Sequence, residues 1–171
     1  MSNHGSRASG RAVLASAILL AATSVDAAAP FTLTGWDARA VGSARTGALQ
    51  RLESQECRKV FTEFTDPEGR TLQQNLEEWT ASPAEYIGLI PFVDGSSQAL
   101  CRKTKTALVA SPGVRRVFVC RTFAELQLRQ PGVAESMVIH EILHTLGLGE
   151  APQPGAPTSI EITQRVEARC R

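Results

Sequence analysis

The chain has 171 residues, of which 43% are hydrophobic and 20% are charged, and its formal net charge is +1 at pH 7. This length and this apolar fraction suit one globular domain with a substantial core. Because the charges nearly balance and no block of Lys and Arg stands out, the composition argues against nucleic acid or an anionic membrane as a partner.

The first 27 residues have the pattern of an export signal. A weakly basic start is followed by an apolar run from Ala12 to Val25 and then by small residues. The run is too short to span a membrane comfortably. We predict a signal peptide over 1–27, cut near Ala27 or Ala29, and one domain over 28–171. The mature protein would be secreted or periplasmic and free of the membrane, and an uncleaved anchor is the alternative.

Helical patterns dominate the first half of the predicted domain. After a loosely held lead-in from Pro30 to Gly42, apolar residues recur at three- and four-residue spacings from residue 43 to about 64. A second, shorter helix is predicted from residue 71 to 80, where Ser82-Pro83 ends it. Together these patterns predict two helices before the first strand.

Short β-rich runs come next. Tyr86–Val93 is predicted to be a strand, and two further strands at 106–110 and 115–120 form a hairpin across Ser111-Pro112-Gly113. A short helical turn at 123–128 and helices from residue 134 and over 158–169 complete the chain. This mixture predicts an α+β fold.

The four cysteines all lie beyond the predicted signal. An even number of cysteines in an exported chain indicates disulfides. Of the three possible pairings we favour Cys101–Cys120, which brackets the predicted hairpin, and Cys57–Cys170, which joins an early helix to the last one. A zinc site made of cysteines is the alternative, but no pair has Cys-x-x-Cys spacing.

The stretch His140-Glu141-Ile142-Leu143-His144 carries the candidate chemistry. Two histidines four residues apart lie on one face of an α-helix, one turn from each other, so their rings can converge on one Zn²⁺ ion. Glu141 can instead take a proton from a water that the metal acidifies. A core helix with incidental histidines is the alternative, but burying such polar groups without a metal or other partners is costly.

This motif, extended by Gly147 and Glu150, resembles that of the zincin metallopeptidases, and the resemblance is confined to residues 138–150. It implies a single zincin-like domain, with a small mixed sheet, an active-site helix and flanking helices. It also implies an exported zinc metalloendopeptidase that acts on protein or peptide substrates. In such domains the last strand before the motif helix usually borders the cleft, so residues 115–120 are expected there.

The third metal ligand must be a carboxylate. His4 would leave with the signal peptide, so the mature chain keeps only His140 and His144, and cysteines in disulfides cannot bind a metal. Glu150 is the leading candidate because it stands where the metzincin branch has its third ligand, and the glycines before it permit a sharp turn. A metzincin would have His or Asp at this position and a downstream methionine, so the subfamily stays open.

Two further glutamates are candidates for the same role. Glu161 lies on the last helix, in the manner of the gluzincin branch, but the sequence from Thr158 to Glu161 is also a capping box that explains it without a metal. Glu167 is a weaker candidate. We assign no residue to stabilise the oxyanion, because Tyr86, Arg121 and Arg165 are each better explained as a core phenol or as surface residues.

Three functions fit the sequence. The first is metal-dependent peptide hydrolysis with Glu141 as the general base. The second is a metal-stabilised zincin-fold protein that binds or supports other molecules without catalysis. The third is a metal-dependent hydrolase of a non-peptide amide or ester. The sequence gives no indication of the oligomeric state.

Overall fold

The computed structural model describes residues 33–103 and 106–171. The predicted signal peptide over 1–27 lies outside these ranges. Within them, no helix combines the length and the hydrophobicity that crossing a membrane requires.

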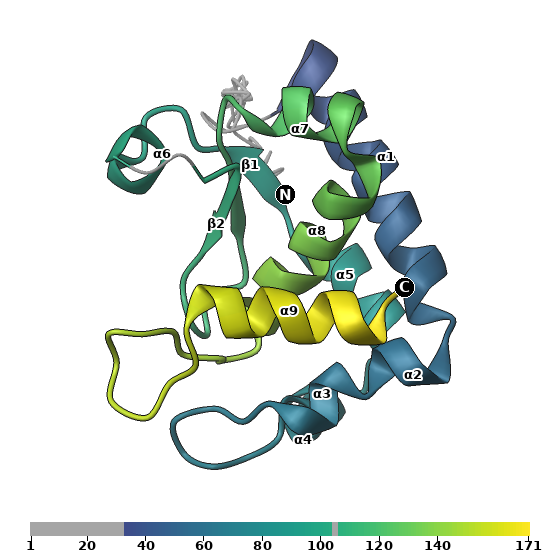
Figure 1. The fold of residues 1–171 in the computed structure, drawn as a ribbon, viewed down its shortest axis with the longest axis vertical. Coiled ribbons are helices and arrows are strands. Elements are labelled where there is room, and N and C mark those ends of the chain that lie inside the picture. The colour runs from purple at the N-terminus through teal and green to yellow at the C-terminus, as the bar shows by residue number, and fades with distance from the viewer. Residues whose placement is uncertain (1–32, 104–105) are drawn as a thin grey trace, which may run out of the picture.

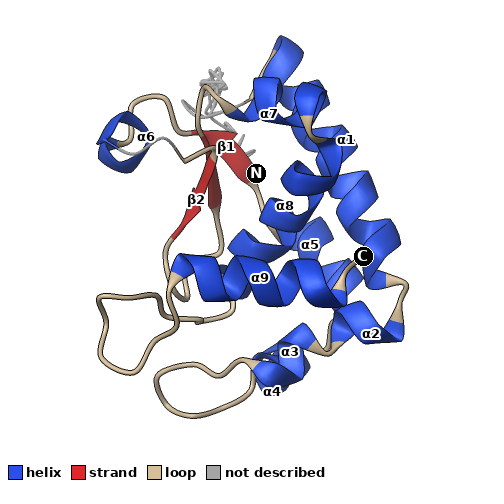
Figure 2. Ribbon diagram, in the orientation of Figure 1, coloured by secondary structure: helices blue, strands red, loops and turns tan. Residues whose placement is uncertain are grey.

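The described residues form an α+β fold, as expected from the sequence (Figures 1 and 2). Helices and a small mixed sheet alternate along the chain in the order α1 Gly35–Leu52, α2 Gln55–Arg58, α3 Val60–Glu63, α4 Leu72–Glu78, α5 Pro83–Leu89, β1 Phe92–Asp94, α6 Ala99–Lys103, β2 Leu108–Ala110, β3 Val117–Val119, α7 Phe123–Arg129, α8 Pro131–Thr145 and α9 Ser159–Arg169.

Helix α8, which carries the motif, lies at the centre of the fold. It contacts α1, α7 and α9 as well as β2, so it separates the sheet from α1 (Figure 1). The approach of α1 is close, because a Cβ on Gly47 would stand 2.3 Å from the side chain of Glu135 on α8. Arg51 then donates a hydrogen bond of 2.7 Å from Nε to that same carboxylate. The motif helix is therefore enclosed by packed elements.

Strand β2, and not β3, lines the open cleft beside His140 and Glu141. Its strand order is β1-β3-β2, with β3 parallel to β1 and antiparallel to β2. Residues 115–120 were expected to border the cleft. This expectation is wrong, because β3 is the central strand of the sheet and pairs with β1 along one edge and with β2 along the other. The predicted hairpin is confirmed, and the N–H of Gly113 at its tip donates to the His144 carbonyl at 2.9 Å.

A second expectation is also wrong, that of a strand over Tyr86–Val93. Residues 83–89 are helix α5, and only Phe92–Asp94 is extended. The Ser82 hydroxyl accepts from the Glu85 N–H while the Glu85 carboxylate accepts from the Ser82 N–H, and Pro83 occupies the first turn. This capping box starts a helix where the apolar run alone suggested a strand.

The helical boundaries before α4 also differ from the prediction. Helix α1 already begins at Gly35, inside the expected lead-in, and the predicted helix over 43–64 divides into α1, α2 and α3. Ser54 caps α2 by accepting from the Glu56 N–H, which gives the chain a new helical direction after α1. The last helix, α9, is confirmed with its capping box at Thr158.

The four cysteines form the two favoured disulfides. Cys57–Cys170 joins α2 to the residue that follows α9, and Cys101–Cys120 joins α6 to the end of β3. Two such bonds indicate an oxidising compartment. Ion pairs strengthen the first junction, since Arg165 pairs with Glu63 at 2.9 Å and Arg169 pairs with both Glu56 and Glu63. Helix α9 is therefore fixed to α2 and α3.

Removal of the two disulfides should cost unequal amounts of stability. The bonds close loops of 113 and 19 residues, and the longer loop leaves more chain entropy to the unfolded state. We expect a Cys57→Ser/Cys170→Ser variant to lose about 5 kcal/mol and a Cys101→Ser/Cys120→Ser variant about 3 kcal/mol of unfolding free energy. Urea titration of each purified variant measures this, and a larger loss for the shorter loop would contradict it.

Candidate metal and catalytic site

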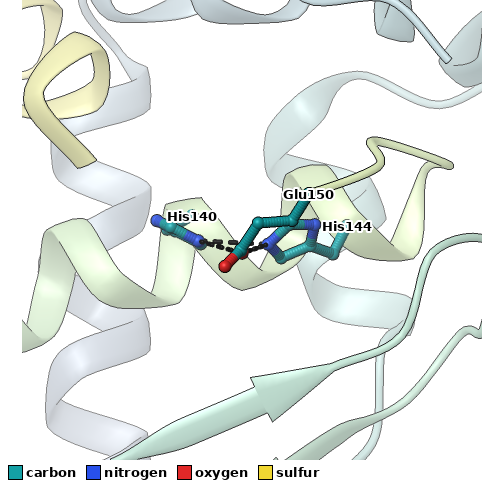
Figure 3. A group of neighbouring side chains, drawn as sticks. All are labelled: His140, His144 and Glu150. Carbon is teal, nitrogen blue, oxygen red and sulfur yellow. Dashed lines mark hydrogen bonds and ion pairs between the residues drawn. The ribbon is translucent and has the colours of Figure 1, made fainter. Parts of the chain in front are cut away.

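Three side chains converge on one point beside α8. His140 and His144 extend from the same side of the helix, and Glu150 reaches between their rings from the loop that follows (Figure 3). The two Nε2 atoms are 3.1 Å apart, and Glu150 Oε2 lies 3.1 Å from Nε2 of His144 and 3.8 Å from that of His140. Both imidazoles are buried, whereas Glu150 is half-buried.

This donor set could hold a metal ion, and its spacing is compatible with zinc. A tetrahedral Zn²⁺ site with bonds of about 2.0–2.1 Å places neighbouring donor atoms about 3.3–3.4 Å apart. The three separations of 3.1, 3.1 and 3.8 Å bracket that value. Two nitrogens and one carboxylate oxygen are also the donor types that catalytic zinc sites use, with a fourth position left for water. A search of the described residues for clusters of at least three His, Cys, Asp or Glu side chains that could hold a metal ion finds these three residues.

The far side of each ring has its own hydrogen-bond partner. His144 Nδ1 lies 2.8 Å from the carbonyl oxygen of Leu148, and His140 Nδ1 lies 3.1 Å from the hydroxyl of Thr163 on α9. Because a carbonyl can only accept, this contact places a proton on Nδ1 of His144, and in the neutral ring the Nε2 lone pair is then free. Partners of this kind set the orientation and the tautomer of metal-binding histidines.

A tight turn after α8 brings Glu150 back to the histidines. Gly147 has φ +110°, and its N–H donates to the His144 carbonyl at 2.9 Å, so the helix closes with a left-handed residue. A side chain at this position would be strained, and its Cβ would lie 3.3 Å from that of Asp66. The glycine therefore serves the turn, as the sequence suggested.

A buried polar pair secures this turn from outside. Asn75 on α4 donates from Nδ2 to the Leu146 carbonyl at 2.9 Å and to Asp66 Oδ2 at the same distance. Burial alone would raise the pKa of Asp66, but hydrogen bonds from Asn75 and Arg70 outweigh it, so the pKa of Asp66 lies below its usual value. No feature of the sequence predicted this contact, because Asn75 and Leu146 are 71 residues apart in the chain.

Glu141 lies beside the converging donors and is not one of them. Its side chain is buried, and Oε2 accepts a hydrogen bond of 2.6 Å from the Ala110 N–H on β2. Burial raises the pKa of Glu141 to about 7, although the neighbouring His140 and the Ala110 N–H oppose the shift. Oε1 has no hydrogen bond within the described residues, so one carboxylate oxygen is left for another molecule.

The pKa values of the donors reflect their mutual contacts. Burial lowers the pKa of His144, which favours the neutral ring. Interaction with His140 lowers the pKa of Glu150 despite its partial burial, with a further contribution from His144. Neutral imidazole and ionised carboxylate are the forms that bind a metal.

An open cleft gives access to this group. It has a volume of about 380 Å³ and is bordered by β2, by the hairpin turn, by α8 and by the loop that carries Glu150 and Gln153. A larger cavity of about 720 Å³ lies beyond Gln153, between the loops at 63–69 and 148–157. Neither histidine lines that cavity, so we take the smaller cleft as the site.

The remaining sequence candidates lie elsewhere. Glu161 caps α9, where its carboxylate accepts from the Thr158 N–H and hydroxyl, and Glu167 is exposed further along the same helix. Tyr86 is buried and donates to the Thr145 carbonyl, while Arg121 and Arg165 line other cavities. Among the three glutamates considered for the third ligand, only Glu150 approaches both imidazoles.

Comparisons with protein-family models, with curated proteins and with solved structures found no match to this chain. Function must therefore be inferred from the site's own geometry.

The contact between Asp66 and Asn75 should make stability sensitive to acid. A carboxylate with a lowered pKa contributes stability above its unfolded pKa of about 3.9, and this contribution is lost as the pH falls through the folded value. We expect Asp66→Asn to lose about 1–3 kcal/mol near pH 7 and to flatten the stability profile below about pH 4. Urea titrations from pH 7 to pH 2.5 test this, with the exposed Glu53→Gln as control. A variant profile parallel to that of the parent chain would contradict it.

Proposed function

We propose that this chain is an exported, zinc-dependent metallopeptidase of the zincin type. The observation that supports the proposal most strongly is the convergence of His140, His144 and Glu150. One ligand atom of each lies within 4.8 Å of the others, and the buried carboxylate of Glu141 is beside them. The motif His-Glu-x-x-His on a central helix and an open cleft bordered by an edge strand also support it. The disulfides agree with export.

The proposed chemistry assigns a separate task to each residue. His140, His144 and Glu150 would hold the metal, and the contacts to their rings would keep the two Nε2 lone pairs available. A zinc ion held there supplies a Lewis acid that polarises a carbonyl group and lowers the pKa of water. Glu141 would accept a proton from the attacking water and later return it to the leaving amine. Its bond to Ala110 would fix the carboxylate in the cleft wall during both transfers.

An extended peptide is the substrate that the cleft favours. Strand β2 is the edge of the sheet and lines the cleft with Leu108, Val109 and Ala110. The other edge of β2 pairs with β3 through Val109 and Phe118, so the cleft side remains the side on which a further strand could add. Such pairing would carry the scissile bond past Glu141, because Ala110 and Glu141 are in direct contact.

Replacement of Glu141 by Gln should separate catalysis from metal binding. The amide keeps the size of the side chain but cannot accept the proton, so hydrolysis of an unfolded protein substrate should fall at least 100-fold. Zinc content, measured by atomic absorption, should stay at the level of the parent chain, since Glu141 is not one of the converging donors.

The same pair of measurements separates the two leading functions. Stoichiometric zinc without cleavage by the parent chain would favour the metal-stabilised, non-catalytic protein. Cleavage that survives Glu141→Gln would overturn the assignment of the base.

Replacement of Glu150 by Ala should weaken metal binding. Loss of one of three protein ligands leaves the two imidazoles alone, and we expect the dissociation constant for Zn²⁺ to rise by at least 100-fold. Competition with a chromophoric chelator measures the constant. Glu161→Gln is the matched control, because Glu161 caps α9 and should affect stability alone. Weak zinc binding by the control with normal binding by Glu150→Ala would assign the third ligand to Glu161.

A further inference from the structure

We propose that Thr163 is a positioning residue for the metal site. Its hydroxyl lies 3.1 Å from Nδ1 of His140, although the two residues are 23 positions apart on different helices. When the hydroxyl accepts the Nδ1–H, His140 keeps its Nε2 lone pair free and directed toward Glu150 and His144. This inference rests on the proposed function, since it concerns how well the same three donors hold zinc.

The two histidines are supported in different ways. The partner of His144 is the backbone carbonyl of Leu148, which any residue at that position would provide. The partner of His140 is a side chain, so its presence depends on the residue at position 163. A hydroxyl can accept and donate, whereas an aliphatic group of the same shape does neither. The orientation of one of the three metal donors therefore depends on a single oxygen atom outside the motif.

His140 also has room to move if that oxygen is removed. A small cavity of about 70 Å³ lies between α8 and α9, and both His140 and Thr163 line it. Five other polar residues line it, and none of them has a hydrogen bond to His140 among the described residues: Thr106, Ser136, Glu141, Ser159 and Glu167. Without the Thr163 hydroxyl, the ring could turn within this space and carry Nε2 away from the other donors.

Helix α9 holds Thr163 firmly against the site. Ile162 and Val166, on either side of Thr163 in the sequence, are fully buried in the core. The end of the helix is fixed to α2 by Cys57–Cys170, and Arg165 is fixed to α3 by its pair with Glu63. Helix α9 lies across the end of α8 (Figure 1) and contacts it, and its Thr163 reaches His140 from outside the motif. The hydroxyl is therefore supplied by a well-anchored element.

Zinc affinity of three variants tests the proposal. Thr163→Val keeps the shape and removes the oxygen, and we expect its dissociation constant for Zn²⁺ to rise about 10- to 100-fold, the usual cost of losing such a partner. Thr163→Ser restores the hydroxyl and should stay within about threefold of the parent chain. Gln164→Ala, at the exposed neighbouring position, is the matched control and should match the parent. Chelator competition on the full chain gives each constant.

The thermal midpoint of each metal-free variant shows whether any loss is structural. Val and Ser should both unfold near the parent midpoint, and Thr163→Ala replaces Val if Val does not fold. Equal zinc affinity of the parent chain and the variant without the hydroxyl overturns the inference while leaving the proposed function intact. The same holds if Ser binds zinc as weakly as Val. Absence of zinc binding by the parent chain itself would overturn the proposed function and this inference together.

Discussion

The fold depends on a conflict at the centre of helix α8. This helix is packed on several sides by apolar neighbours, yet it buries His140, Glu141 and His144 in one turn and a half. Polar groups in such a position are costly unless each finds a partner. The surrounding elements provide these partners. Strand β2 gives an N–H to Glu141, the turn after α8 gives a carbonyl to His144, and α9 gives a hydroxyl to His140.

These partners come from parts of the chain that the motif does not predict. The four-residue spacing of the two histidines within one helix is a local property, so the sequence predicted them and Glu141 as neighbours on α8. The position of Glu150 also followed from local chemistry, because Gly147 adopts the left-handed conformation that a sharp return requires. Thr163 and Asn75 could not be found in this way, since only tertiary packing brings them to α8.

The fold shows the same division between local and tertiary information. The hairpin, the last helix and the disulfide pairing followed from turn residues, caps and spacing. The strand expected over Tyr86–Val93 failed because the capping box at Ser82 and Glu85 outweighs an apolar run that suits either structure. The prediction that residues 115–120 border the cleft was wrong because the strand order depends on the parallel pairing of β3 with β1, which no short sequence pattern encodes.

The contact between Glu141 and Ala110 has a second effect, on self-association. A bare sheet edge offers its backbone groups to other copies of the chain and is a common starting point for aggregation. Strand β2 spans only Leu108–Ala110, and the bond to Glu141 occupies one of its outward donors. The Leu108 carbonyl is also engaged, by the hydroxyl of Thr106. Two of the outward backbone groups of β2 are thus engaged within the chain, which makes the edge a poorer template for a second copy, while its remaining outward groups stay available to an extended peptide in the cleft.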